Sequence, residues 1–263
     1  MSTAEQVTLY CAQAEALIEH GRSAEAGERL AEALRLDPQS GLALGLMSLV
    51  KLNLREPREA AKLARQAIAA EPDEEWGHRM LSVALRASRR YKQAIEPARE
   101  AARLAPDSPD ALRNLAVSLI QVRALTEARK VADRIVFLTP ESAYGHELLA
   151  VVSAAERRKE QAERHWRDAL ALDPENPTYH NNLALALLER GEHGEAMERF
   201  FGALRSDPKS DTYHDNLGVG LENYRHASLR YFIVFFMNLF VLLGIVGLVQ
   251  ETASGKWGEP RWG

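Results

Sequence analysis

Six prolines follow one another along the chain at a constant interval of 34 residues: Pro38, Pro72, Pro106, Pro140, Pro174 and Pro208. The surrounding residues repeat as well, as the segments LRLDPQS and ALDPENP illustrate. A fixed period of this length is the sequence signature of an architecture in which similar units stack on their neighbours. The chain is therefore predicted to be an array of repeats.

Small residues recur in the same phase as the prolines. With each proline counted as position 32, position 20 is alanine in all six units: Ala26, Ala60, Ala94, Ala128, Ala162 and Ala196. Position 27 is alanine in five units and Ile135 in the fourth, and position 8 is alanine, serine or glycine in seven. Small side chains at these positions let two antiparallel helices approach closely, while apolar residues at helical spacing fill the seam.

The end of each unit carries helix stop and start signals. The residue before a proline disfavours the helical region, so proline at position 32 ends the second helix. Residues that favour the N-cap of the next helix stand two places later, at Ser40, Ser108, Ser142, Asn176 and Ser210. Local signals and period therefore agree on a pair of helices in every unit.

This pattern resembles the tetratricopeptide repeat family. The resemblance implies an all-α fold, a right-handed superhelical solenoid of antiparallel helix pairs, followed here by one transmembrane helix. We predict an N-terminal extension (1–6), six repeat units (7–208), a partial seventh unit (209–228), the transmembrane helix (229–250) and a short polar and aromatic tail (251–263).

The resemblance also implies a groove along the inner face of the first helices that binds a protein or peptide. Its predicted middle is basic, with Arg79, Arg86 and Arg113 flanked by Trp76 and Tyr144. Arginine grips carboxylates bidentately, and aromatic side chains supply contact area at low entropic cost. The groove is therefore predicted to bind a partner with an acidic segment. A solvated face with salt bridges between repeats is the alternative.

Other residues of the groove are polar or aromatic. Glu147 is expected in the fifth unit, and Tyr179, Asn181 and Asn182 in the sixth. Asn114 and Asn182 share one repeat position, and side-chain amides there can hold a peptide backbone because they both donate and accept hydrogen bonds. These residues complete the predicted peptide-binding set.

Four units depart from the family pattern with a histidine at position 4: His78, His146, His180 and His214. Equivalent positions of neighbouring units lie roughly 10 Å apart when helices pack. That spacing is too long for shared coordination of one ion, so we expect a packing role and no metal site.

Residues 231–249, YFIVFFMNLFVLLGIVGLV, contain no charged side chain. As a helix they would rise about 29 Å, close to the hydrocarbon thickness of a bilayer. We predict a single span that contacts lipid. Asn238 could hydrogen-bond to a second span and so support a homodimer. The N-terminus has no basic, apolar leader pattern, so we expect the repeats in the cytoplasm and the C-terminus across the membrane.

Composition excludes several function classes. The net charge of -4 gives no sign of a nucleic-acid partner, and a single cysteine, Cys11, forms no intramolecular disulfide. Phosphate loops, zinc-protease motifs and nucleophile elbows are missing from the sequence. We therefore expect neither an enzyme nor a cofactor. The predicted function is a membrane-tethered scaffold or adaptor; the alternative is a permanent structural or assembly subunit of a membrane complex.

Overall fold

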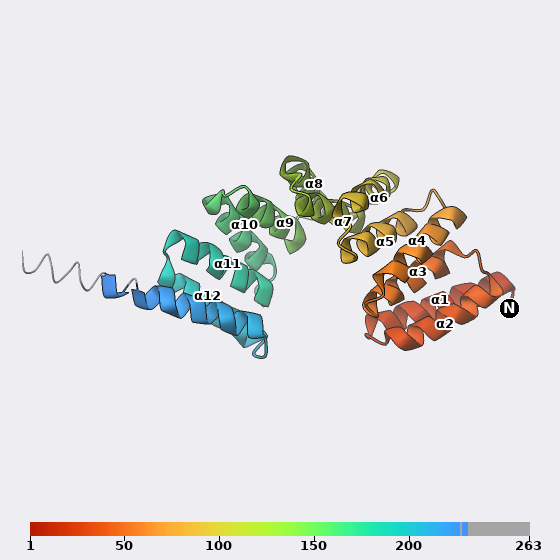
Figure 1. The fold of residues 1–263 in the computed structure, drawn as a ribbon, viewed down its shortest axis with the longest axis horizontal. Helices are drawn as coiled ribbons and strands as arrows, with labels where there is room; N and C mark the ends of the chain where they lie inside the picture. Colours follow the sequence, from red (N-terminus) through yellow and green to blue (C-terminus); the bar gives the residue numbers. More distant parts are fainter. Residues whose placement is uncertain (227, 231–263) are drawn as a thin grey trace, which may run out of the picture. The chain divides into compact units, whose positions relative to one another are not determined.

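The computed structural model describes residues 1–226 and 228–230, and the regular elements in these residues are all helices. They include α1 (Thr3–Glu19), α2 (Ser23–Leu36), α3 (Gly41–Asn53), α4 (Pro57–Ala70), α5 (Glu75–Ala87), α6 (Tyr91–Leu104), α7 (Pro109–Gln121), α8 (Leu125–Leu138), α9 (Ala143–Ala155), α10 (Lys159–Leu172), α11 (Pro177–Arg190) and α12 (His193–Ser206). Figure 1 shows them following one another as antiparallel pairs, and residues 211–226 form a further helical stretch. The predicted all-α solenoid of helix pairs is confirmed.

The chain divides into two compact units, residues 1–174 and residues 175–263. In the first unit, α1 to α10, the first helix of a pair contacts both its own partner and the first helix of the next pair, as α3 contacts α4 and α5. In the second unit, α11 packs against α12. First helices that touch each other can share one binding surface.

Helix starts follow the predicted signals. A side-chain oxygen accepts a hydrogen bond from a backbone N–H of the helix's first turn at Ser40, Ser108, Asn176 and Ser210. Ser142 has the extended backbone of an N-cap but makes no such bond. The cap function predicted for Ser142 is therefore wrong in that detail.

The first helix begins earlier than the sequence indicated. Residues 3–6, assigned above to an extension, belong to α1. Ser2 caps this helix by accepting from the Glu5 N–H, while the Glu5 carboxylate accepts from the Ser2 N–H at 2.7 Å. This reciprocal pair of bonds, a capping box, stabilises an extra turn ahead of the repeat phase.

A residue with a left-handed backbone conformation connects the two helices of each of the six pairs. The backbone φ angle is positive at the same repeat position in all six units, in Gly21, Arg55, Arg89, Arg123, Arg157 and Gly191. The following N–H bonds back to a carbonyl five residues earlier, as from Arg90 to Leu85 at 2.8 Å. This is the Schellman arrangement, which satisfies the last carbonyls of the first helix.

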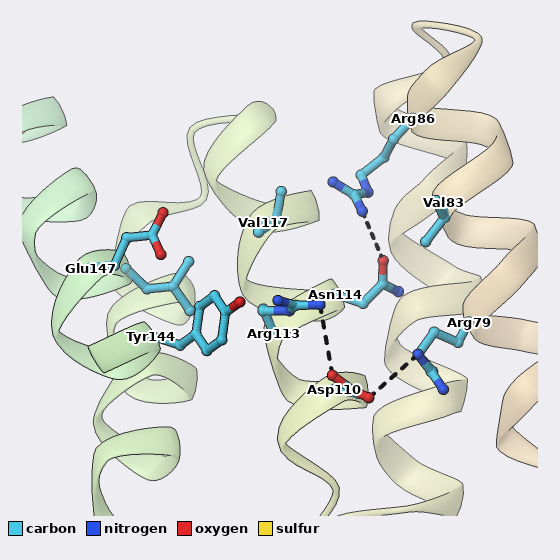
Figure 2. Close-up of a pocket in the computed structure, with 10 residues that line it drawn as sticks. Arg79, Val83, Arg86, Asp110, Arg113, Asn114, Val117, Tyr144 and Glu147 are labelled. Carbon is cyan, nitrogen blue, oxygen red and sulfur yellow. Dashed lines mark hydrogen bonds and ion pairs between the residues drawn. The ribbon is translucent and has the colours of Figure 1, made fainter. Parts of the chain in front are cut away.

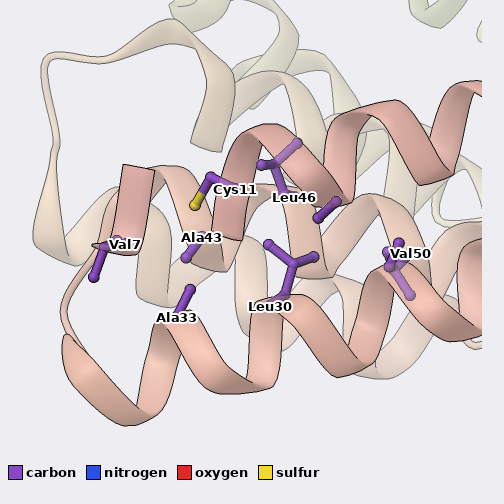
Figure 3. Packing of buried hydrophobic residues seen from close by; sticks show 9 residues of the cluster. Val7, Cys11, Leu30, Ala33, Ala43, Leu46 and Val50 are labelled. Carbon is purple, nitrogen blue, oxygen red and sulfur yellow. The ribbon is translucent and has the colours of Figure 1, made fainter. Parts of the chain in front are cut away.

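The recurring small residues lie in the core, as predicted. Residues at positions 20 and 27 are at most 3% exposed, and those at position 8 are fully buried in the six complete units. Gly218, the equivalent residue of the partial seventh unit, is exposed. Figure 3 shows how one cluster joins three helices through Val7, Cys11, Leu30, Ala33, Ala43, Leu46 and Val50.

Cys11 is part of this apolar cluster. Its side chain is 1% exposed. Burial, followed by the charge of Glu15, raises the pKa of the thiol to about 11. The side chain therefore stays a neutral thiol at physiological pH and contributes to packing.

One glycine in α3 makes room for an aromatic side chain of α5. A Cβ atom on Gly45 would lie 2.1 Å from Cδ1 of Trp76. The indole thus rests directly on the α3 backbone, which only a residue without a side chain allows. Gly45 thereby positions Trp76, one of the predicted binding residues.

The apolar segment 231–249 and the tail 251–263 lie outside the described residues. Within the part of the chain that is described, no helix has both the length and the apolar character needed to cross a bilayer.

Replacing Gly45 with alanine is expected to lower the free energy of unfolding by about 1–3 kcal/mol, the usual cost of overpacking a core. Urea denaturation followed by circular dichroism measures this. The matched control is Gly27→Ala in α2, whose Cβ would meet only Val50 Cγ1 at 3.5 Å. That control should raise stability by roughly 0.5–1 kcal/mol, since alanine is the better helix former. Equal gains in both variants would contradict the placement of Trp76.

Replacing Gly21 with alanine tests the left-handed turn. A Cβ there meets no atom within 4 Å, and φ is +72°. Backbone strain is therefore the sole expected cause of a loss of about 1 kcal/mol in the free energy of unfolding. The same denaturation experiment measures it. Stability equal to that of the unaltered protein would show that this turn does not need a left-handed residue.

Candidate peptide-binding groove

A cavity of about 270 Å³ lies against the first helices of three consecutive pairs, α5, α7 and α9. Six of the ten predicted binding residues line it: Arg79, Arg86, Arg113, Asn114, Tyr144 and Glu147. Figure 2 shows them with Val83, Val117 and Asp110, which also line the cavity. The repeat phase thus brings together side chains that are up to 68 residues apart in the sequence.

Arg79 is already held by acidic neighbours. Its Nε donates to Glu75 Oε2 at 3.0 Å, and its Nη1 lies 3.8 Å from Asp110 Oδ2 on the next first helix. The guanidinium also lies 4.4 Å from the centroid of the Trp76 ring, a cation–π contact. Arg79 is therefore held in place, and the carboxylate contact expected at Arg79 is made within the protein itself.

Arg86 differs because its partner is neutral. Its Nη2 donates to Asn114 Oδ1 at 3.2 Å, and its Nε is buried without a hydrogen-bond partner. Burial, and after it the positive charge of Arg113, lowers the pKa of Arg86. No carboxylate of the described residues lies within ion-pair distance of this guanidinium. An anion bound here would stabilise its charged form.

Arg113 lies between the other two arginines and the aromatic end of the cavity. Its guanidinium is 4.7 Å from the centroid of the Tyr144 ring on α9. Its Nη2 is 3.7 Å from Asp110 Oδ1, and the side chain is 43% exposed. Because that ion pair is long and open to solvent, Arg113 can exchange Asp110 for an acidic ligand at little cost.

Asn114 connects two first helices. Its Oδ1 accepts from Arg86 and from the Ser82 hydroxyl at 3.5 Å, while its Nδ2 is buried without a partner. The Asn114 amide therefore orients Arg86 at the wall of the cavity. This role of Asn114 lies within the protein, and its contact with a peptide backbone stays a prediction.

Trp76 lies on α5 but is not among the residues that line the cavity. The other three predicted residues belong to the second unit. Tyr179 is 4% exposed, so its side chain is buried and its predicted place on the groove surface is wrong. It follows Thr178, which is the true equivalent of Tyr144 in the 34-residue frame. One residue along a helix turns a side chain by about 100°, away from the inner face.

Asparagines in the second unit hydrogen-bond to one another. Asn216 Nδ2 donates to Asn181 Oδ1 at 2.8 Å, and Asn181 Nδ2 donates to Asn182 Oδ1 at 3.3 Å. Asn181 is 5% exposed. Much of the hydrogen-bonding capacity that was predicted to hold a peptide is thus used within the protein.

The position-4 histidines have different surroundings. His78 and His214 place Nε2 at 3.0 Å from the carbonyl oxygens of Pro72 and Pro208. His146 instead lies beside His165 and Asp168, a cluster that the comparison of repeat positions missed. Burial, as the largest cause, lowers the pKa of His165.

Several solved structures share this fold at low sequence identity. PilF of Pseudomonas aeruginosa superposes with a TM-score of 0.67 at 19% identity, over 82% of this chain and 98% of its own. PilW, a type IV pilus biogenesis factor, gives 0.72 at 16% identity, with coverage of 82% and 98%. A chain of the APC/C hetero-tetramer Cut9–Hcn1 gives 0.72 at 17% identity, and this chain spans 43% of it.

Comparison with curated proteins gives no match. Models of the tetratricopeptide repeat match residues 46–109 and 148–211, and a second model of this repeat matches residues 85–152. Together the matches run without a gap from residue 46 to residue 211, which is more than half of the chain. The protein therefore belongs to the tetratricopeptide repeat family.

Proposed function

We propose that this chain is a membrane-tethered scaffold or adaptor that binds an acidic segment of a protein partner in the cavity between α5, α7 and α9. The observation that carries the proposal is Arg86, a half-buried arginine whose Nε is buried without a hydrogen-bond partner and which has no acidic partner among the described residues. The proposed role is binding rather than catalysis.

Charge around the cavity supports an acidic ligand. Three arginines line it against two acidic residues, Asp110 and Glu147. Arg79 is neutralised by Glu75, whereas Arg86 has only an amide and Arg113 a long, exposed pair. Each charge-assisted hydrogen bond to a ligand carboxylate is worth roughly 1.5–3 kcal/mol. Two such contacts suffice to select an acidic segment.

Aromatic and apolar walls give the site its shape. Arg79 lies at one end and Tyr144 with Arg113 at the other, while Val83 and Val117 also line the cavity. Stacked aromatic side chains are rigid and lose little entropy on binding. A ligand with acidic side chains on one side and small apolar ones on the other fits this surface.

The groove is tested with a fluorescein-labelled peptide of alternating glutamate and alanine, titrated by fluorescence anisotropy. Arg86→Gln and Arg113→Gln should each weaken binding by about tenfold or more, from the loss of a charge-assisted hydrogen bond. Arg103→Gln is the matched control, since Arg103 is an exposed arginine of α6 paired with Glu100. It should leave the affinity unchanged.

A second peptide with glutamine in place of glutamate should bind weakly to every form of the protein. Affinity for the acidic peptide should also fall with added salt, because exposed charges are screened. Unchanged affinity in the Arg86→Gln and Arg113→Gln variants would refute a role of this cavity in acidic recognition.

The proposed tether is the segment 231–249, supported by its length and its lack of charge. Arg225 and Arg230 precede it closely, whereas Lys256 and Arg261 follow at a greater distance. Positive residues near a span favour the cytoplasmic side. We therefore place the repeats in the cytoplasm and the C-terminus across the membrane.

Alkaline carbonate extraction of membranes, followed by protease treatment of sealed vesicles, tests the tether. The unaltered protein should stay in the pellet, with its repeats digested from the cytoplasmic side. Phe236→Lys combined with Phe240→Lys should release it, since each lysine at a span centre costs about 2.5–3.5 kcal/mol. Phe137→Lys with Phe201→Lys is the matched control, because both phenylalanines are exposed on the repeats. Carbonate release of the unaltered protein would refute the tether.

A permanent assembly subunit is the second candidate. Exposed apolar side chains favour it: Phe137 is 83% exposed, and Val219, Leu221, Tyr224 and Leu229 are about half exposed near the proposed span. PilW is a pilus biogenesis factor and Cut9–Hcn1 a hetero-tetramer, so the fold also serves in assemblies. Purification at native abundance distinguishes the two, because a subunit keeps its partner at fixed stoichiometry and an adaptor exchanges it.

A further inference from the structure

Two histidines and one aspartate meet between α9 and α10. His146 comes from α9, and His165 and Asp168 lie one turn apart on α10. Each offers a ligand atom, and these atoms all lie within 4.8 Å of one another. The cluster lies within one helix pair of the first unit, so its geometry depends on a single packing contact.

The distances between the histidine nitrogens and the aspartate oxygen match those between ligands of one metal ion better than those of direct hydrogen bonds. His146 Nδ1 and His165 Nδ1 lie 3.6 and 3.7 Å from Asp168 Oδ2, beyond hydrogen-bonding range. Ligand atoms around a tetrahedral zinc ion are about 3.4 Å apart, given metal–ligand bonds near 2.1 Å. The two observed separations are therefore close to those of neighbouring ligands in such a shell.

Both Nδ1 atoms are also unsatisfied. Each is buried and lacks a hydrogen-bond partner. Buried polar atoms in proteins are usually paired, so two orphaned ring nitrogens facing one carboxylate require an explanation. The Asp168 side chain is 53% exposed, which leaves a route for an ion to enter and for water to complete the coordination.

We propose that His146, His165 and Asp168 form a binding site for a divalent transition-metal ion, with zinc as the preferred ion. Imidazole is a ligand that suits zinc, and zinc sites combine two histidines with one carboxylate and a water molecule. The ion would link α9 to α10. Arg129 of α8 is a nearby positive charge, but it is paired with Glu156 at 2.6 Å.

Other repeats show what is special about the fifth. In the third unit, His78 and Glu100 occupy the positions of His146 and Asp168, but Pro97 stands where His165 would be. The sixth unit has His180 with Arg199 and Gly202 at the other two positions. A full set of three ligands at these repeat positions thus occurs in the fifth unit alone.

Titration of the untagged full-length protein with Co²⁺ tests the site, because tetrahedral Co²⁺ has a distinctive visible absorption spectrum. One ion per chain should bind with this spectrum, and Zn²⁺ should displace it. His165→Ala and Asp168→Asn should each weaken binding by more than about tenfold, since even residues that only support a ligand contribute 10–100-fold. His78→Ala is the matched control and should bind as the unaltered protein does.

Folding of the variants is checked by circular dichroism, and Asp168→Asn serves where His165→Ala fails to fold, since Asp168 is half exposed. Zn²⁺ should also raise the melting temperature of the unaltered protein and not that of Asp168→Asn, because the ion binds only the folded helix pair. Absence of the tetrahedral spectrum, or equal binding by Asp168→Asn, would overturn the proposal and leave adventitious histidine binding as the explanation.

Discussion

Close contact between paired helices is the constraint on which the rest of the structure depends. Positions 8, 20 and 27 are buried in every complete unit, and nearly all of them hold alanine or serine. Side chains of this size allow the two backbones to approach, so that larger residues such as Leu30 and Phe200 fill the remaining seam. The fourth unit accommodates the larger Ile135 at position 27, whereas a larger residue at position 8 or 20 is expected to push the paired helices apart.

That constraint leaves the inner face of the first helices free to vary. The buried positions are fixed by packing. Arg79, Arg86 and Arg113 instead line one surface of the repeats, where solvent, neighbouring side chains or a ligand can satisfy their hydrogen bonds. Their grouping brings like charges together, as the effect of Arg113 on the pKa of Arg86 shows. Packing does not require such a grouping.

Much of this architecture could be predicted from the sequence, because it follows from period and residue size. The helix pairs, the buried alanines and six cavity residues all followed from the 34-residue phase. The prediction for Tyr179 was wrong because a shift of one residue in that phase turns the side chain from the groove surface to a buried position. The capping box at Ser2 and Glu5 was not predicted for another reason. It lies ahead of the first repeat and has no counterpart in the other units.

Contacts between unlike positions could not be predicted from the repeat. The left-handed turn falls on glycine at Gly21 and Gly191, which the sequence signals, but on arginine in four units, which it does not. Likewise, Gly45 makes sense only against Trp76 in the next pair. The histidine cluster joins positions 4, 23 and 26 of one unit, so comparing position 4 between units could not reveal it.

Helix α9 joins the two candidate sites of the first unit. Tyr144 and Glu147 line the cavity from this helix, and His146 lies between them in sequence but belongs to the cluster with α10. Adjacent residues on a helix diverge by about 100°, so one short segment serves both surfaces. An ion that fixed α9 against α10 would also fix the aromatic wall on which Arg113 stacks. Occupancy of the metal site and the shape of the groove would then be coupled through the orientation of a single helix.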